Sequence, residues 1–388
     1  MSDSKKKVPK RRFEEFSNAN DWELRKLGEV VQITMGQSPN GTNYTDNPND
    51  YILVQGNADM KNGQVVPRVW TKQITKTAAI GDIILSVRAP VGDVGKTNYN
   101  VVLGRGVAGI KGDEFIYQVL FKMRLENYWA KYSTGSTFES INSNDLKEAK
   151  VFVPKELEKK EIGMFFKQLD NTIALHQRKL EKIKALKTAY LSEMFPAEGE
   201  SKPKRRFAGF TDAWELRKLG EVVQITMGQS PNGTNYTDNP NDYILVQGNA
   251  DMKNGQVVPR VWTKQITKTA AIGDIILSVR APVGDVGKTN YNVVLGRGVA
   301  GIKGDEFIYQ VLFKMRLENY WAKYSTGSTF ESINSNDLKE AKVFVPKELE
   351  KKEIGMFFKQ LDNTIALHQR KLKKLQNIKK AYLNEMFI

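Results

Sequence analysis

Side chains that can hydrogen-bond to DNA are concentrated in the loops and turns of this sequence. Arginine pairs with guanine, and asparagine or glutamine pairs with adenine, through two parallel hydrogen bonds worth about 1–3 kcal/mol. Lysine and the Ser-Thr-Gly-Ser-Thr run at 133–137 suit phosphate oxygens. We predict DNA contacts at Gln37, Ser38, Asn40, Asn43, Tyr44, Asn57, Lys61, Arg68, Lys72, Arg88 and Arg105, and at Gln229, Ser230, Asn232, Asn235, Tyr236, Asn249, Lys253, Arg260, Lys264, Arg280 and Arg297. Gln55 and Lys76 lie in the same polar surroundings.

Three short motifs resemble parts of catalytic sites, but none has the surroundings that its chemistry needs. Residues 104–109 match the dinucleotide-binding pattern G-x-G-x-x-G, yet no helix is predicted to open there. Residues 95–97 resemble the end of a phosphate-binding loop whose first glycine is absent, and residues 47–49 lack the second proline and the aromatic of the adenine methyltransferase motif. We therefore predict no catalytic residue in this chain.

Cysteine and histidine usage excludes further classes of site. The sequence has no cysteine, which rules out disulfides, thiolate metal sites and a cysteine nucleophile. Its two histidines, His176 and His368, lie outside the predicted globular parts, so a Ser-His-Asp triad is excluded there, and no metal site is predicted. The basic N-terminus has no apolar stretch behind it and no segment is long and apolar enough for a membrane span, so we expect a cytoplasmic location and no membrane partner.

The charge distribution favours a polyanionic partner without indicating bulk wrapping. The net charge is +15 and the isoelectric point is about 9.5. Residues 22–153 nevertheless hold 15 Lys and Arg against 13 Asp and Glu, so most of the excess lies in the helices and connectors.

An exact internal repeat determines the predicted architecture. Residues 22–180 recur without a difference as residues 214–372. Two copies of this length are two whole modules rather than a solenoid. Identity this complete indicates either a recent duplication or a constructed fusion.

Each module begins with a part in which β-strand signals dominate. Apolar, β-branched runs predict strands at 30–34, 51–55, 65–70, 83–87, 101–103 and 151–153, with a tight hairpin turn at Asn62-Gly63. Helical spacing predicts a helix within 115–132, and residues 143–145 are typical of the cap of a short helix. We predict the α+β class, with two repeated α/β domains.

Each module ends in a long amphipathic helix. Apolar residues alternate four and three apart over about five heptads, from Ile162 to Met194 and from Ile354 to Met386. We expect the two helices to form an antiparallel coiled coil with a pseudo-twofold axis. Predicted helix-pairing residues are Ile173, His176, Leu180, Ile365, His368 and Leu372, with the histidines as a register-setting polar pair near the axis.

These signals divide the chain into six segments. They are a basic N-terminal lead at 1–21, a first globular domain at 22–153, a spacer helix at 154–195, a linker at 196–213, a second, identical domain at 214–345 and a second spacer helix at 346–388.

The arrangement and several local sequences resemble the specificity subunit of type I restriction–modification enzymes. The matching pieces in the first module are Trp-Glu-Leu-Arg-Lys-Leu-Gly-Glu at 22–29 after a Lys-Arg-Arg-Phe lead, Gly-Asp-Ile-Ile-Leu-Ser at 81–86, Val-Phe-Val-Pro at 151–154, and residues 162–180. The resemblance spans nearly the whole chain. Each short motif is moderately specific, whereas the doubled order of globular part and helix is highly specific.

The resemblance implies a function and a set of partners. Each globular part would be a target-recognition domain that reads half of a split site in double-stranded DNA, and the helices would dock two modification subunits. Those subunits would bring S-adenosylmethionine and methylate adenine, and restriction subunits would bring ATP and Mg²⁺. The chain would hold no cofactor of its own and would not be an enzyme by itself.

This sequence departs from the family pattern because its two recognition domains are identical. Identical domains related by a twofold axis would read an interrupted palindrome with a fixed gap. A free-standing, sequence-specific DNA-binding regulator is the main alternative, and a protein-binding coiled-coil scaffold is a third hypothesis that predicts no salt-sensitive DNA affinity.

Overall fold

The computed structural model describes residues 7–132, 140–324 and 332–388. The chain divides into two compact units. Unit 1 comprises residues 1–177 together with 371–388, and unit 2 comprises residues 178–370. The predicted phosphate-contacting run at 133–137 lies outside the described residues.

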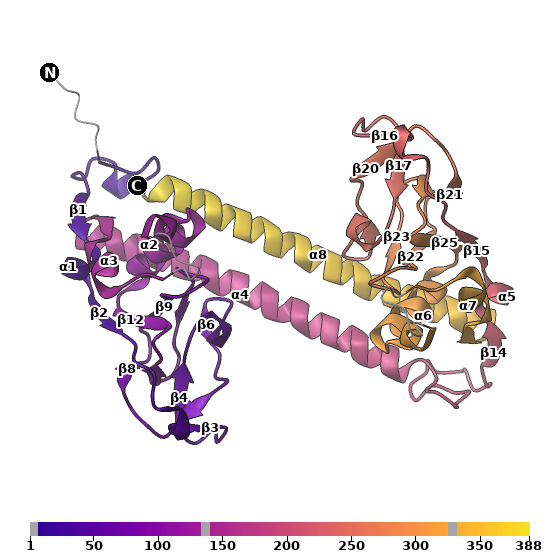
Figure 1. The fold of residues 1–388 in the computed structure, drawn as a ribbon, viewed down its shortest axis with the longest axis horizontal. Helices are drawn as coiled ribbons and strands as arrows, with labels where there is room; N and C mark the ends of the chain where they lie inside the picture. The colour runs from indigo at the N-terminus through magenta and orange to yellow at the C-terminus, as the bar shows by residue number, and fades with distance from the viewer. Residues whose placement is uncertain (1–6, 133–139, 325–331) are drawn as a thin grey trace. The chain divides into compact units, whose positions relative to one another are not determined.

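The described residues of unit 1 form three sheets, three short helices and segments of the two long helices (Figure 1). A six-stranded sheet has the order β2 (Gln32–Met35), β12 (Val107–Lys111), β9 (Ile83–Ser86), β10 (Val94–Lys96), β6 (Gln64–Val65), β5 (Met60–Lys61). A five-stranded sheet has the order β3 (Tyr44–Thr45), β7 (Trp70–Thr71), β4 (Tyr51–Val54), β11 (Val101–Leu103), β8 (Lys76–Ala78), and β1 (Glu23–Lys26) pairs with β13 (Lys150–Val153). The helices are α1 (Leu27–Val30), α2 (Glu114–Leu125), α3 (Ser143–Glu148), the first part of α4 (Glu156–Glu193) and the last part of α8 (Glu348–Met386). The 3₁₀ turns are η1 (Glu14–Phe16), η2 (Gly41–Asn43), η3 (Asn57–Asp59) and η4 (Tyr128–Tyr132).

Unit 2 repeats these sheets. The equivalents are β14 (Glu215–Lys218) with β26 (Lys342–Val345), the order β15 (Gln224–Met227), β25 (Val299–Lys303), β22 (Ile275–Ser278), β23 (Val286–Lys288), β19 (Gln256–Val257), β18 (Met252–Lys253), and the order β16 (Tyr236–Thr237), β20 (Val261–Thr263), β17 (Tyr243–Val246), β24 (Val293–Leu295), β21 (Lys268–Ala270). Its helices are α5 (Leu219–Val222), α6 (Glu306–Leu317), α7 (Ser335–Glu340), the first part of α8 and the last part of α4, with η5 (Gly233–Asn235), η6 (Asn249–Asp251) and η7 (Tyr320–Tyr324).

Strand β9 lies at the centre of unit 1 because both of its faces are buried. Its Ile83 and Leu85 belong to a core cluster with the helices, whereas Ile84 belongs to a second cluster between the two larger sheets. None of the three has exposed surface. Alternate side chains of a strand point to opposite faces, so this strand joins the two layers.

Within each unit two long helices pack antiparallel. In unit 1, Phe165 of α4 contacts Tyr382 of α8, and Asp170, further along α4, pairs with Lys379, which precedes Tyr382. Unit 2 repeats this order in the contacts of Tyr190 with Phe357 and of Lys187 with Asp362. The prediction of antiparallel helix packing is confirmed within each unit.

A buried ion pair joins the helix pair of unit 1 to its globular part. The Lys379 ammonium is 2.7 Å from one oxygen of Asp170 and 3.9 Å from the ring centre of Phe121 on α2. Gln118 of α2 donates a hydrogen bond to Asp170 at 2.8 Å. Gly163 allows the close approach of α4 to the start of α2, because a Cβ there would lie 3.1 Å from Glu114 Cβ.

His176 belongs to unit 1 and His368 to unit 2, so their pairing stays a prediction, as do the pairing roles of Ile173, Leu180, Ile365 and Leu372.

Several predicted element boundaries were wrong for local reasons. The run 65–70 is two strands, because Pro67 separates β6 from β7 and cannot donate a ladder hydrogen bond. The helix expected within 115–132 ends at Leu125, where Asn127 takes a φ of 54° before η4 begins. The cap of α3 is Asn142, whose side chain accepts hydrogen bonds from the backbone of Asn144 and Asp145.

The predicted hairpin turn is confirmed. Asn62 and Gly63 have φ values of 54° and 73°, and Lys61 pairs with Gln64 across the turn. Positive φ at both central residues is the requirement of a type I′ turn.

Candidate nucleic-acid interface

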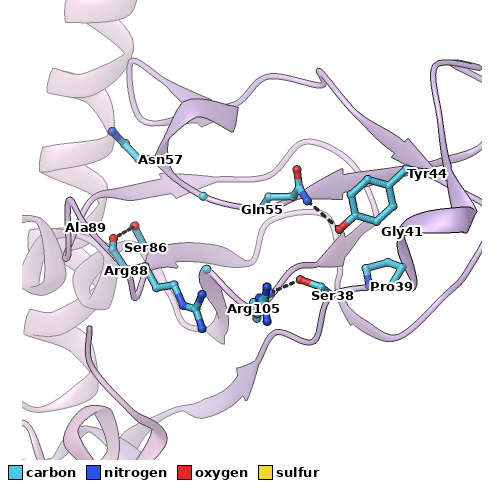
Figure 2. A pocket seen from close by; sticks show the side chains of 12 residues that line it. Ser38, Pro39, Gly41, Tyr44, Gln55, Asn57, Ser86, Arg88, Ala89 and Arg105 are labelled. Carbon is cyan, nitrogen blue, oxygen red and sulfur yellow. Dashed lines mark hydrogen bonds between the residues drawn. The ribbon is translucent and has the colours of Figure 1, made fainter. Parts of the chain in front are cut away.

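A polar pocket opens in unit 1 where the six-stranded and five-stranded sheets end side by side (Figure 2). Its volume is about 560 Å³, and the corresponding pocket of unit 2 measures about 340 Å³. The lining residues of the first are Ser38, Pro39, Gly41, Tyr44, Gln55, Gly56, Asn57, Ser86, Arg88, Ala89, Arg105 and Gly106. Those of the second are Ser230, Tyr236, Gln247, Gly248, Asn249, Ser278, Arg280, Ala281, Arg297 and Gly298.

The link between β11 and β12 holds Arg105 at the pocket. Gly104 donates a backbone hydrogen bond to Val54 at 2.8 Å, and a Cβ on Gly106 would collide with the carbonyl oxygen of Gln55. The backbone N–H of Arg105 donates to the hydroxyl of Ser38 at 3.2 Å. The glycines flanking Arg105 therefore serve a close crossing of two chain segments rather than a dinucleotide site.

A buried carboxylate shapes the opposite wall. Asp59, 3% exposed, accepts backbone hydrogen bonds from Gln55 at 2.7 Å and from Gly56 at 3.2 Å. The Gln55 side chain then donates to the Tyr44 hydroxyl at 2.9 Å, a contact visible in Figure 2. Asp59 thus fixes the backbone that carries Gln55 into the pocket.

Two guanidinium groups give the pocket its positive charge. In Figure 2 the Arg88 side chain extends toward that of Arg105. Within the described residues, neither arginine has a carboxylate partner, and the same holds for Arg280 and Arg297. Unpaired guanidinium groups beside hydroxyl and amide groups can bind phosphate oxygens or the acceptor atoms of a base edge.

Five predicted contact residues of each domain line its pocket. They are Ser38, Tyr44, Asn57, Arg88 and Arg105 in unit 1, and Ser230, Tyr236, Asn249, Arg280 and Arg297 in unit 2. Gln55 lines the pocket as well.

Three predicted residues near the pocket have hydrogen bonds that hold the loop after β2. Asn40 caps η2 by accepting from the backbone of Thr42, and its own backbone N–H donates to Gln73 at 2.8 Å. The Asn43 side chain donates to the same Gln73 oxygen at 3.0 Å. The carbonyl of Gln37 accepts a hydrogen bond from Thr75 at 2.6 Å. These residues, and Gln229, Asn232 and Asn235 of unit 2, are not among the lining residues of the two pockets described above.

The remaining predicted residues do not line either pocket, and of these only Lys61 and Lys253 lie on strands. Arg68 is 3.4 Å from Asp59 and also donates to the carbonyl of Ala58. Lys61 on β5 and Lys72 after β7 are exposed. Their equivalents in unit 2 are Lys253, Arg260 and Lys264. Their contacts with DNA stay predictions.

Sequence reasoning missed the small residues of the pocket wall. Gly41, Gly56, Ser86 and Ala89 carry little chemical signal, and only the fold brings them together. Ser86 could have been suspected because it ends a wholly buried strand, where its hydroxyl donates to the Arg88 carbonyl at 2.9 Å.

Two segments of the chain match one family model. The model describes the type I restriction modification DNA specificity domain, and it matches residues 19–185 and 211–377. The chain belongs to this family. The resemblance inferred from the sequence is therefore confirmed, and the description of a specificity domain agrees with the expectation that this chain is not the enzyme by itself.

Curated relatives carry the same family's names. A protein of Methanocaldococcus jannaschii named for the specificity subunit of the type I restriction enzyme MjaX is 27% identical over 413 residues, covering 94% of this chain and 92% of the relative. The MjaVIII specificity subunit of the same organism is 20% identical and covers 69% of this chain and 68% of its own length.

Solved structures share the fold. A type I restriction–modification S subunit from M. genitalium gives a TM-score of 0.67 at 15% identity, covering 98% of this chain and 99% of that one. A chain from a structure of the assembly and conformational transition of a type I system gives a TM-score of 0.53 at 22% identity, covering 94% and 97%. Two repeated domains of sheets and helices, with long helices packed together, are thus a known arrangement.

The described part of the chain contains neither a membrane-spanning helix nor a cluster of metal-binding side chains. Among the described residues, no helix is long and apolar enough to cross a membrane. No group of three or more histidine, aspartate or glutamate side chains in that part of the chain could hold a metal ion.

Proposed function

We propose that this chain is the DNA-reading specificity subunit of a type I restriction–modification complex. The observation that carries the proposal is the pocket that each unit holds, with two guanidinium groups lacking carboxylate partners among the described residues. Family membership and the names of the relatives support it. The DNA substrate implies a cytoplasmic location.

Because the two recognition domains have the same sequence, they constrain the symmetry of the DNA target. Identical domains read identical bases, and we propose that the antiparallel helices orient them oppositely, so that the target is an interrupted palindrome. A spacer of fixed length would fix the number of unread base pairs.

Exposed apolar residues on the helices support a protein partner. In unit 1, Leu157 of α4 is 74% exposed. Met164 and Leu175 are also exposed, and they lie on the same face of the helix as Leu157 because they follow Leu157 by 7 and 18 residues. Unit 2 repeats this stripe at Leu349, Met356 and Leu367. We propose that two modification subunits dock there, bringing S-adenosylmethionine, and that restriction subunits bring ATP and Mg²⁺.

Mapping methylated adenines in cells that carry this chain and its modification subunit tests the proposal. We expect one palindromic motif with one gap length. An asymmetric or directly repeated motif would contradict the opposed orientation of the domains. Shortening both helices by the same number of residues should change the gap and leave the half-site bases unchanged.

The alternative function, a free-standing DNA-binding regulator, differs in whether a partner subunit binds this exposed apolar stripe. It requires no enzyme partner, so the chain should purify alone from cells that express a modification subunit. Co-elution that is lost in a variant with Leu157→Lys and Leu349→Lys, with DNA affinity retained, would favour the specificity subunit.

A further inference from the structure

Hydrogen bonds inside the pocket restrict which base edges its amide can read. The Nε2 group of Gln55 donates to the Tyr44 hydroxyl at 2.9 Å, and Gln247 makes the same bond to Tyr236 at 2.9 Å. Paired recognition of adenine by glutamine uses both the amide nitrogen and the amide oxygen. One of the two N–H donors of this nitrogen is occupied in both units, so Gln55 and Gln247 each keep one N–H and the amide oxygen for DNA.

Arg105, by contrast, keeps its donors while its backbone is fixed. Its backbone N–H donates a hydrogen bond to the Ser38 hydroxyl. The neighbouring Gly104 and Gly106 lie so close to the backbone of Gln55 that a Cβ at either position would be crowded. In unit 2 the Nε of Arg297 donates to Ser230 at 3.4 Å, which leaves both terminal nitrogens of the guanidinium as donors. A positioned pair of parallel N–H donors matches the O6 and N7 acceptors of guanine in the major groove.

Arg88 is held differently. Its carbonyl accepts the Ser86 hydroxyl, and no side-chain hydrogen bond to its guanidinium is seen among the described residues. A long, unanchored cation is suited to a phosphate contact, which requires charge rather than a fixed plane.

We propose that each pocket reads a guanine in its half-site, with Arg105 and Arg297 as the base-reading residues and Arg88 and Arg280 as phosphate contacts. This inference rests on the proposed function and deepens it. It predicts a G·C pair in each half of the recognised palindrome.

The test uses the full chain with both copies substituted together. Methylated adenines are mapped in cells that also express the modification subunit, and DNA binding is measured over a salt series. In the variant with Arg105→Ala and Arg297→Ala, we expect the guanine position to accept other bases and cognate affinity to fall about 10- to 100-fold. In the variant with Arg88→Ala and Arg280→Ala, we expect affinity for cognate and unrelated DNA to fall alike, with a shallower salt dependence and an unchanged motif.

Three comparison variants separate the loss of base reading from the loss of folding. Arg68→Ala with Arg260→Ala removes arginines already paired with Asp59 and Asp251, and it should leave the guanine position unchanged. Asn57→Ala with Asn249→Ala alters the same pockets and should leave the guanine position intact. Arg105→Gln with Arg297→Gln keeps a polar side chain of smaller reach, so a relaxed guanine position with an unchanged melting temperature would support base reading.

Three outcomes would overturn the inference. One is a defined parental motif without guanine, and another is an arginine-105 variant that is folded and still selects guanine. Each of these leaves the proposed function standing. The third is a parent that methylates no defined motif, which removes the proposed function and this inference with it.

Discussion

The buried carboxylate of Asp59 accepts a hydrogen bond from the backbone N–H of Gln55 at 2.7 Å, and Asp251 does the same for Gln247. One carboxylate oxygen thus serves two successive backbone donors, since Gly56 also donates to it. An uncharged amide in this position would satisfy these donors less well.

Asp59→Asn with Asp251→Asn should therefore lower the free energy of unfolding by about 1–3 kcal/mol and weaken DNA binding. Urea unfolding and a binding titration measure the two effects. Because Arg68 is 53% exposed, Arg68→Ala is the control and should cost less than about 1 kcal/mol. Equal costs for the two variants would show that the ion pair, and not the backbone bonds, gives Asp59 its role.

Glycine is required at position 106 and not at position 41, although both residues line the pocket. A Cβ on Gly106 would collide with the Gln55 carbonyl oxygen, whereas a Cβ on Gly41 would meet nothing within 4 Å. Gly106→Ala should lower the free energy of unfolding by about 1–3 kcal/mol, and Gly41→Ala should be nearly neutral. Thermal unfolding of the two variants measures this difference, and a neutral Gly106→Ala would contradict the close crossing.

Phe387 completes the aromatic core of unit 1. Its ring lies 5.1 Å from Phe115, 5.5 Å from Phe166 and 6.3 Å from Trp22. Phe387→Ala should destabilise unit 1 by about 3–5 kcal/mol. Hydrogen exchange should show the loss in unit 1 alone, and Phe195→Ala, its counterpart in unit 2, should show the reverse. Protection lost equally in both units by either variant would count against the division into units.

The buried lysines should make stability rise with pH in the alkaline range. Burial lowers the pKa of Lys379 from 10.5, with Asp170 opposing, and the pKa of Lys187 is lowered in the same way. Below 10.5 the unfolded chain then binds more protons than the folded chain, so raising the pH relieves the cost of burying the charges. Burial also raises the pKa of Tyr117 from 10.0, and this acts in the opposite direction at higher pH.

The unfolding free energy of the parent chain is compared with that of a variant in which both ion pairs are replaced by apolar residues. The variant carries Asp170→Leu, Lys379→Met, Asp362→Leu and Lys187→Met. The parent should gain unfolding free energy relative to this variant as the pH rises toward 10.0. Urea unfolding at a series of pH values measures the difference. A difference that stays constant with pH would show that these lysines keep their ordinary pKa.

Periodicity in the sequence was sufficient to predict the elements with strong patterns. The long helices follow from heptads, and the Asn62-Gly63 turn follows from its requirement for positive φ. Strand β12 was not predicted, because Val107 and Ala108 lie inside the glycine-rich motif at 104–109, and glycine weakens a strand signal. Its place between β2 and β9 depends on long-range pairing, which no local pattern records.

The sequence predicted which residue types form the site, but it did not predict which side chains each of them contacts. Arg68 and Arg105 are equivalent as sequence letters, yet Arg68 lies against Asp59 and Arg105 lines the pocket. The distinction arises from a carboxylate nine residues away from Arg68, buried by the fold. Gln55 likewise donates one amide N–H to the Tyr44 hydroxyl, and this contact also becomes visible only in three dimensions.

The insertion of Phe387 beside Trp22 has a consequence for biosynthesis. Residues 178–370 of unit 2 are contiguous, whereas unit 1 draws on both the beginning of the chain and residues 371–388. At ribosomal speeds of about 5–20 residues per second, the first domain waits roughly 10–40 s for its last aromatic side chain. During that interval the first domain lacks the aromatic ring that packs on Trp22, whereas Phe195, which packs on Trp214, is synthesised before the second domain begins.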